Sequence, residues 1–434
     1  MSQPLAAHPK PWPSIVLWLL ILAGMFVHLQ AALQFNPLDA IFSDPGRHWQ
    51  FGHNPLLADP LSGMDAPLYQ LWLALIAKLT LGDGRAIGIY AGLLSVFTTW
   101  VWYRLMREVL PSRRLALIGW AVFLWMPSWI GIFSYFMPET LLLPTLGLAL
   151  WFTFRSLRVK TMESFVWCVV FWMVASLARP FALPLAILSL WALLLAHEQP
   201  AKKALVAAVI AICACVPPAY RTYQILRVWS PFGYTLMNQI YFESGKREVQ
   251  IQLSKNNGSV GWVYGFSSPS MGMQPLRPLS QWTSSREGTV HIAVNIDQGN
   301  RDWLVALRDS WGGLLLHVKM WWENTLYTTF GESWPDNNPS HFWEWLSVQL
   351  RWVWAPILVL VVAGNVAYLI HQKKAPLFLV LSMTAMVACY FVPATPTEGR
   401  YRKQIEGFMI VNALWLVSKN AQAKATLATE SMPV

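Results

Sequence analysis

Long apolar segments separated by short polar ones make up most of this chain. They occupy residues 14–34, 67–81, 86–103, 115–134, 139–154, 164–178, 181–196, 203–219, 353–371, 376–393 and 405–418. A helix needs about 20 mainly apolar residues to cross a bilayer, and backbone polar groups inside lipid are satisfied best within helices. The pattern therefore predicts an all-α polytopic membrane protein.

The composition agrees with this fold class. Hydrophobic residues make up 55% of the 434 residues and charged residues only 12%, whereas a soluble domain carries about 25% charged residues. The net charge of +10 could indicate a nucleic-acid partner. However, the basic residues lie in short groups between apolar segments, without the basic stripe and interleaved aromatic residues of a nucleic-acid interface. We therefore expect no nucleic-acid partner.

Segment 67–81 decides the topology. It has about fifteen residues, short for a span, and its apolar side chains recur at the spacing of an amphipathic helix. If it crossed the membrane, the basic groups at 104–114 and 155–160 would lie outside, against the positive-inside rule. If it lies flat in the interface, the basic groups lie in alternate connections that all face the cytoplasm. We therefore predict about ten transmembrane helices, a juxtamembrane amphipathic helix in the first external loop, and cytoplasmic termini.

This topology divides the chain into four parts. We expect an N-terminal transmembrane module (1–219, including the first external loop), a large external segment that folds as a small subdomain (220–350), a C-terminal transmembrane module (351–420), and a disordered cytoplasmic tail (421–434). The other external connections are then a turn at 134–139, a turn at 179–180, and a loop at 395–404.

The densest polar cluster follows the first apolar segment. Asp44, Arg47 and His48 place a carboxylate, a guanidinium and an imidazole within five residues beside the membrane, which indicates a reactive site. The alternative is a turn, because Ser-Asp-Pro-Gly suits turn formation and Asp44 would then cap it. His48 and His53 could bind a metal, but no third ligand is spaced to join them. We therefore expect no metal or other cofactor.

Further ionisable residues lie at the predicted external ends of helices. Glu139 stands at the mouth of a helix, where an acid is either functional or a favourable partner of the helix dipole. Arg400 and Arg402 lie before the last span, where external cations depart from the positive-inside trend. A bound phosphate would account for them, as would anionic lipid headgroups. Arg179 is a further candidate phosphate ligand on the same side.

The order of these features resembles the GT-C superfamily of membrane glycosyltransferases, which includes protein O-mannosyltransferases and aminoarabinose transferases. Asp44 matches the acid of the first loop, Ala66-Pro67-Leu68-Tyr69 the start of the juxtamembrane helix, Glu139 the acid of the second loop, and Arg400-Tyr401 the late Arg-Tyr pair. The resemblance covers roughly the first 200 residues and the last 40. Here Asp44 is followed by Pro-Gly-Arg-His instead of a second acid, and the second-loop acid is more often Asp in the family.

The resemblance implies transfer of a sugar from a polyprenyl-phosphate carrier to a hydroxyl group of a lipid, glycan or protein, with inversion, at the periplasmic face of the bacterial inner membrane. Asp44 would be the base that accepts the hydroxyl proton, with Glu139 and His48 orienting the substrates. The expected substrate-binding residues are Arg47, Tyr69, Arg179, Arg400, Tyr401 and Arg402. Of these, Arg400, Arg402 or Arg179 would stabilise the departing phosphate.

Two other classes of membrane protein remain as alternatives. A polysaccharide polymerase or ligase also uses polyprenyl-linked sugars and arginines on this face. A transporter of lipid-linked sugars would have many spans, but its ionisable groups would usually lie near the bilayer centre. The order of acids in the first two loops favours the transferase over both, and three ionisable groups on one side disfavour a non-catalytic scaffold.

Overall fold

A computed structural model describes residues 12–53, 65–226, 229–233, 248–254, 261–266, 290–295, 329–330, 340–372, 375–390 and 399–430. The N-terminal part comprises α1 (Trp12–Gln34), η1 (Pro37–Ala40), α2 (Ser43–His53), α3 (Pro67–Thr80), α4 (Gly84–Val109), α5 (Arg113–Leu124), α6 (Pro127–Gly131), η3 (Ile132–Ser134), α7 (Glu139–Val159), α8 (Met162–Ala178), η4 (Pro180–Ala182), α9 (Leu183–Ala196) and α10 (Pro200–Leu226). The C-terminal part comprises α14 (Phe342–Gln349), η8 (Leu350–Val353), α15 (Trp354–Gln372), α16 (Leu377–Tyr390), η9 (Gly399–Arg402) and α17 (Lys403–Glu430). The described chain is thus predominantly helical, as predicted.

Among the described residues, five helices are long and apolar enough to cross a membrane, and six if the bent pair α5–α6 is one span. The three shorter apolar helices, α8, η4–α9 and α16, and the first part of α17 are the other segments that a ten-span topology requires. The class of multi-pass membrane protein is therefore confirmed, whereas the number of ten spans stays a prediction.

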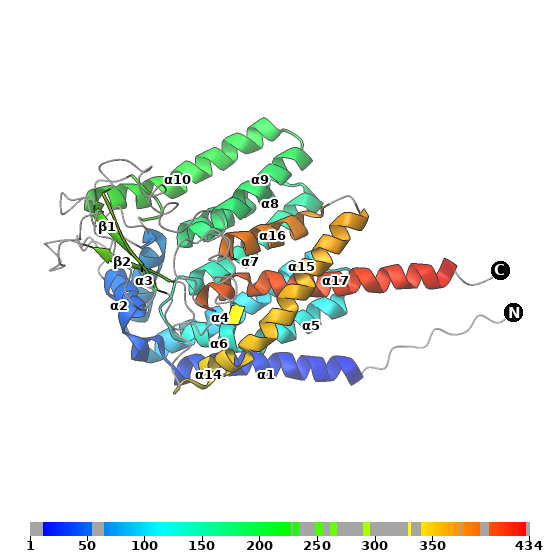
Figure 1. Ribbon diagram of the computed structural model, residues 1–434, viewed down its shortest axis with the longest axis horizontal. Helices are drawn as coiled ribbons and strands as arrows, with labels where there is room; N and C mark the ends of the chain where they lie inside the picture. The colour runs from blue at the N-terminus through cyan, green and yellow to red at the C-terminus, as the bar shows by residue number, and fades with distance from the viewer. Residues whose placement is uncertain are drawn as a thin grey trace.

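The long helices run lengthwise through the molecule (Figure 1). The start of α1 and the end of α17 lie at one end, on the right of the view, whereas α2 and α3 lie at the opposite end together with the strands. Two chain ends on the same side agree with an even number of spans. We call the end that carries α2 and α3 the external end, following the predicted topology.

Helix α3 has the character of an interfacial helix. It is 14 residues long and begins with a proline, which suits the first turn of a helix. One face packs into the protein through Tyr69, Leu73 and Ile76, whereas the apolar side chains of Leu71, Leu75 and Leu79 are exposed. An exposed apolar face on a helix too short to span fits a position in the headgroup region, and this placement stays a prediction.

Three predicted boundaries differ in the structure. The apolar segment 115–134 is broken into α5 and α6, which meet at 57°, because Pro127 cannot continue the hydrogen-bonding pattern of α5. At Asp44, where the alternative interpretation was a turn, the chain forms the first turn of helix α2. The predicted tail begins within α17, which continues to Glu430 through an alanine-rich sequence of high helix propensity.

The predicted external segment also contains strands. β1 (Glu248–Ser254) lies between β2 (Gly261–Phe266) and β3 (Val290–Asn295) in an antiparallel sheet. The all-α class therefore holds for the membrane part, and the described residues of this segment add a small sheet to it. The helices around it also shift the predicted boundaries at 219 and 350, because α10 ends at Leu226 and α14 begins at Phe342.

The buried side chain of Trp102 is one contact between the N-terminal and C-terminal parts. Trp102 of α4 lies between Gly147 of α7 and Gly407 of α17, and a side chain at either glycine would collide with its indole ring. The indole N–H donates to the carbonyl oxygen of Leu143 at 3.0 Å, and the ring packs edge-on against Phe408. This contact fixes the first turns of α17 beside α7, where the candidate site lies.

The topology can be tested with single cysteines, in a background where the four native cysteines are replaced. We expect Ser112→Cys, in the α4–α5 connection, to resist a membrane-impermeant thiol reagent in intact cells and to react after permeabilisation. Ile41→Cys, at an exposed position between η1 and α2, should react in intact cells. Labelling of Ser112→Cys from outside would contradict a flat α3 and cytoplasmic termini.

Candidate active site

Helix α2 places three predicted site residues on one face. Asp44, Arg47 and His48 occupy positions i, i+3 and i+4, which lie next to one another on a helix surface. Arg47 Nη1 donates to Asp44 Oδ1 at 2.8 Å. The structure therefore brings these residues together, as the sequence predicted.

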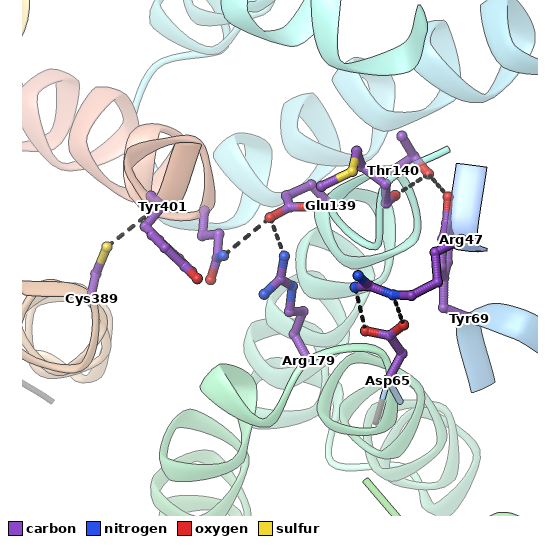
Figure 2. Close-up of polar contacts among 10 residues, drawn as sticks. Arg47, Asp65, Tyr69, Glu139, Thr140, Arg179, Cys389 and Tyr401 are labelled. Atoms are coloured by element: carbon purple, nitrogen blue, oxygen red, sulfur yellow. Dashed lines mark hydrogen bonds and ion pairs between the residues drawn. The ribbon is translucent and has the colours of Figure 1, made fainter. Parts of the chain in front are cut away.

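Arg47 also contacts a carboxylate that the sequence analysis missed. Its Nε donates to Asp65 Oδ2 at 2.8 Å and its Nη2 to Asp65 Oδ1 at 3.1 Å. This two-pronged geometry is the strongest form of an arginine–carboxylate contact, and it ties α2 to the residue just before α3 (Figure 2). The sequence signal was an acid directly before Ala66-Pro67, the start of the juxtamembrane helix.

His48 is buried behind these carboxylates. Its side chain is 3% exposed, its Nδ1 lies 3.5 Å from Asp65 Oδ2, and its ring packs edge-on against Tyr69 with the ring centres 5.3 Å apart. Burial lowers the pKa of His48 below its usual value, although Asp65 opposes this shift. The imidazole is therefore mainly neutral at pH 7, which suits hydrogen bonding to a substrate better than pairing with an anion.

A second arginine–carboxylate pair lies at the same end of the helices (Figure 2). Glu139, the first residue of α7, is fully buried and accepts a hydrogen bond from Arg179 Nη2. Gln404 of α17 donates to the same Glu139 oxygen at 3.5 Å. The Arg179 guanidinium also lies 5.9 Å from the centre of the Tyr401 ring. Glu139, Arg179 and Tyr401 thus meet as a group, with Gln404 as a member that the sequence did not indicate.

Short contacts connect the two pairs. The Tyr69 hydroxyl lies 3.3 Å from Thr140 Oγ1, and Thr140 follows Glu139 in the chain. Trp49, next to His48, stacks on Phe136 at 4.4 Å between ring centres. The charge of Arg179 also contributes to the pKa shift of His48. The first external loop and the turn before α7 therefore form one site.

The remaining predicted residues lie elsewhere or outside the described side chains. Arg402 is 1% exposed and pairs with Glu406 at 3.3 Å, and its Nη1 donates to the Thr329 carbonyl oxygen at 2.8 Å. It therefore belongs to a buried cluster with Glu406 and Ser128, which donates to Glu406 at 2.6 Å. The side chain of Arg400 lies outside the described residues, although its backbone is part of η9.

Helix α14, at the C-terminal end of the predicted external segment, packs next to the site. The hydroxyl of Tyr135 donates to the fully buried Glu344 of α14 at 2.5 Å, and the His341 ring stacks on Phe35 with centres 3.9 Å apart. Tyr135 precedes Phe136, which packs on Trp49. Neither Glu344 nor His341 stood out in the sequence, because their partners lie far away along the chain.

Among the described residues, no group of three or more His, Cys, Asp or Glu side chains is arranged to hold a metal ion. His53 lies at the end of α2 beside Trp49. The expectation of a metal-independent site stays a prediction.

The class of protein follows from a comparison with known families. Residues 64–220 match the family described as dolichyl-phosphate-mannose-protein mannosyltransferase. The match covers about a third of the chain and includes Asp65, Tyr69, Glu139 and Arg179. It supports a membrane glycosyltransferase of the GT-C type and confirms the predicted resemblance. No curated protein matches the chain.

Proposed function

We propose that this protein transfers a sugar from a polyprenyl-phosphate carrier to a hydroxyl acceptor at the periplasmic face of a bacterial inner membrane. The observation that carries the proposal is the meeting of two arginine–carboxylate pairs at the external end, within and beside the segment that matches the mannosyltransferase family. That family is named for a lipid-linked sugar donor of the same chemical class.

In this reaction the acceptor oxygen attacks the anomeric carbon as its bond to the phosphate oxygen breaks. The hydroxyl proton passes to Asp44, and the electron pair of the broken bond leaves with the polyprenyl phosphate. Asp44 suits the role of base because its carboxylate is 28% exposed and accepts a hydrogen bond from Arg47 through Oδ1. A single displacement inverts the configuration at the anomeric carbon.

The leaving phosphate needs positive charge more than a proton. Arg179 lies in the site with 21% of its side chain exposed, so it can contact a phosphate while Glu139 holds it in position. Arg400 belongs to η9, next to Tyr401, which faces Arg179. We assign both arginines to the donor phosphate, and Tyr69, Tyr401 and the neutral His48 to the sugar and acceptor hydroxyls.

The place of the ionisable groups favours an enzyme over a transporter. Asp44, Arg47 and Asp65 lie on or beside α2, outside the candidate spans, and Glu139 is the first residue of its span. A transporter would usually have such groups near the middle of its spans. The acceptor remains a lipid, a glycan or a protein in this proposal.

The donor class can be tested with the purified protein in lipid nanodiscs. We expect transfer from one member of a panel of undecaprenyl-phosphate-linked hexoses and pentoses to a membrane extract, detected by mass spectrometry. The corresponding nucleotide sugars alone should give no product, because the sequence has no glycine-rich phosphate-binding motif in the loops that are predicted to be cytoplasmic. Transfer from a nucleotide sugar without a lipid carrier would refute the proposal, and addition of many sugars in one product would indicate a polymerase.

A further inference from the structure

Asp65 is more than a neighbour of the proposed catalytic residues. Its carboxylate receives two hydrogen bonds from Arg47 and lies 3.5 Å from His48 Nδ1. Its side chain is 17% exposed, compared with 28% for Asp44. Asp65 is therefore the more enclosed of the two acids.

Arg47 divides its donors unequally between the two acids. Two of its nitrogens face Asp65 and one faces Asp44. A guanidinium is a rigid planar fork, so a two-pronged contact to one carboxylate fixes the direction in which its remaining N–H groups point. Asp65 thus determines which N–H groups of Arg47 can donate to Asp44.

We propose that Asp65 is a positioning residue that holds Arg47 and thereby leaves the Asp44 carboxylate available to the acceptor hydroxyl. Without Asp65, Arg47 would be able to contact both oxygens of Asp44. A carboxylate held in that way is a weaker base, because an adjacent cation stabilises its ionised form. The inference rests on the proposed function, in which Asp44 accepts the proton.

The charge state of Asp65 agrees with this role. Burial raises the pKa of Asp65, but the charge of His48 when it is protonated, the charge of Arg47 and the hydrogen bonds from Arg47 together outweigh burial and hold the pKa below its usual value. Burial likewise opposes the charge of Arg47, whereas Asp65 and Asp44 raise its pKa. Both groups therefore stay ionised at neutral pH, as a permanent anchor requires.

The test uses the full-length protein in nanodiscs with two readouts. The first is turnover with the undecaprenyl-phosphate-linked sugar that the wild-type protein uses. The second is binding of undecaprenyl phosphate alone, measured as a thermal shift. We expect Asp65→Asn to lower turnover by about 10–100-fold while carrier binding stays within about twofold, because Arg179 and Arg400, the proposed phosphate ligands, both remain. A purely structural role would lower both readouts together.

Two further variants make the inference sharper. Adding Arg47→Met to Asp65→Asn should cause no further loss of turnover, since residues that act through one another are non-additive. Asp65→Glu keeps a carboxylate for Arg47 and should retain turnover within about tenfold of wild type, which also decides the question if Asp65→Asn does not fold.

Each outcome has one meaning. Wild-type turnover in Asp65→Asn, a parallel loss of carrier binding, additive losses in the double variant, or a loss in Asp65→Glu as large as that in Asp44→Asn would overturn the positioning role and leave the proposed function in place. A wild-type protein that transfers no sugar from any member of the donor panel would instead overturn the proposed function.

Discussion

Asp44→Asn is expected to lower turnover by about 10²–10⁴-fold, the usual contribution of a general base. The substitution keeps the size of the side chain and its ability to accept a hydrogen bond from Arg47 at 2.8 Å, but it removes the oxygen that takes the proton. Because the donor phosphate does not contact this group in the proposed mechanism, apparent affinity for the donor should change little. Turnover and donor KM, measured on the purified protein, check both expectations.

Asp39→Asn is the matched control for this experiment. Asp39 lies five residues earlier, in η1, and its side chain is exposed, so turnover should stay within about twofold of wild type. If Asp44 only stabilises the start of α2, asparagine would replace it well, because both residues suit a helix start. Near-normal turnover in Asp44→Asn would therefore remove Asp44 from the mechanism and make Glu139 the next candidate.

Arg179→Met is expected to destabilise the protein by about 3–5 kcal/mol, because it leaves a buried carboxylate without its cation. Glu139 is fully buried, and Arg179 is its ion-pair partner. Replacing both residues, as Glu139→Gln with Arg179→Met, should restore most of the stability, because the unpaired buried carboxylate is then absent. It should not restore the activity, because the Arg179 guanidinium is absent as well. Unfolding in mixed micelles with increasing SDS measures the change in the free energy of unfolding.

Arg158→Met provides the comparison for this effect. Arg158 pairs with Glu108 at 2.9 Å, but its own side chain is 63% exposed, so solvent screens the pair and the loss should stay below about 1 kcal/mol. Equal destabilisation by Arg158→Met and Arg179→Met would show that burial of Glu139 is not the cause. Full activity of the double variant would exclude Arg179 as a phosphate ligand.

The sequence predicted the parts of the site that follow from local geometry. Asp44, Arg47 and His48 lie within five residues, so any helix through them places their side chains together. Glu139 and Arg179 both mark helix ends on the side that the basic loops define as external. Charge and apolar length therefore predicted that both residues lie on the same side, and the structure adds that they are in direct contact.

Other contacts depend on tertiary packing, which no local pattern reveals. In the sequence, Arg402 was grouped with Arg400 as a candidate phosphate ligand. However, neighbouring residues on a helix point about 100° apart. Arg402 therefore contacts Glu406, whereas Tyr401 faces Arg179. Asp65 had neither a helical period nor a nearby cation in the sequence to distinguish it. Its partner Arg47 lies 18 residues earlier.

The position of α17 also has a genetic consequence. The part of the chain that matches a known family ends at residue 220, yet Gln404 contacts Glu139 and Gly407 makes room for Trp102. A premature stop codon just before α17 would leave the matched segment intact but would remove the residues of α17 that pack against the site. Late nonsense alleles of this gene should therefore behave as complete losses of function, as severe as a deletion of the whole reading frame.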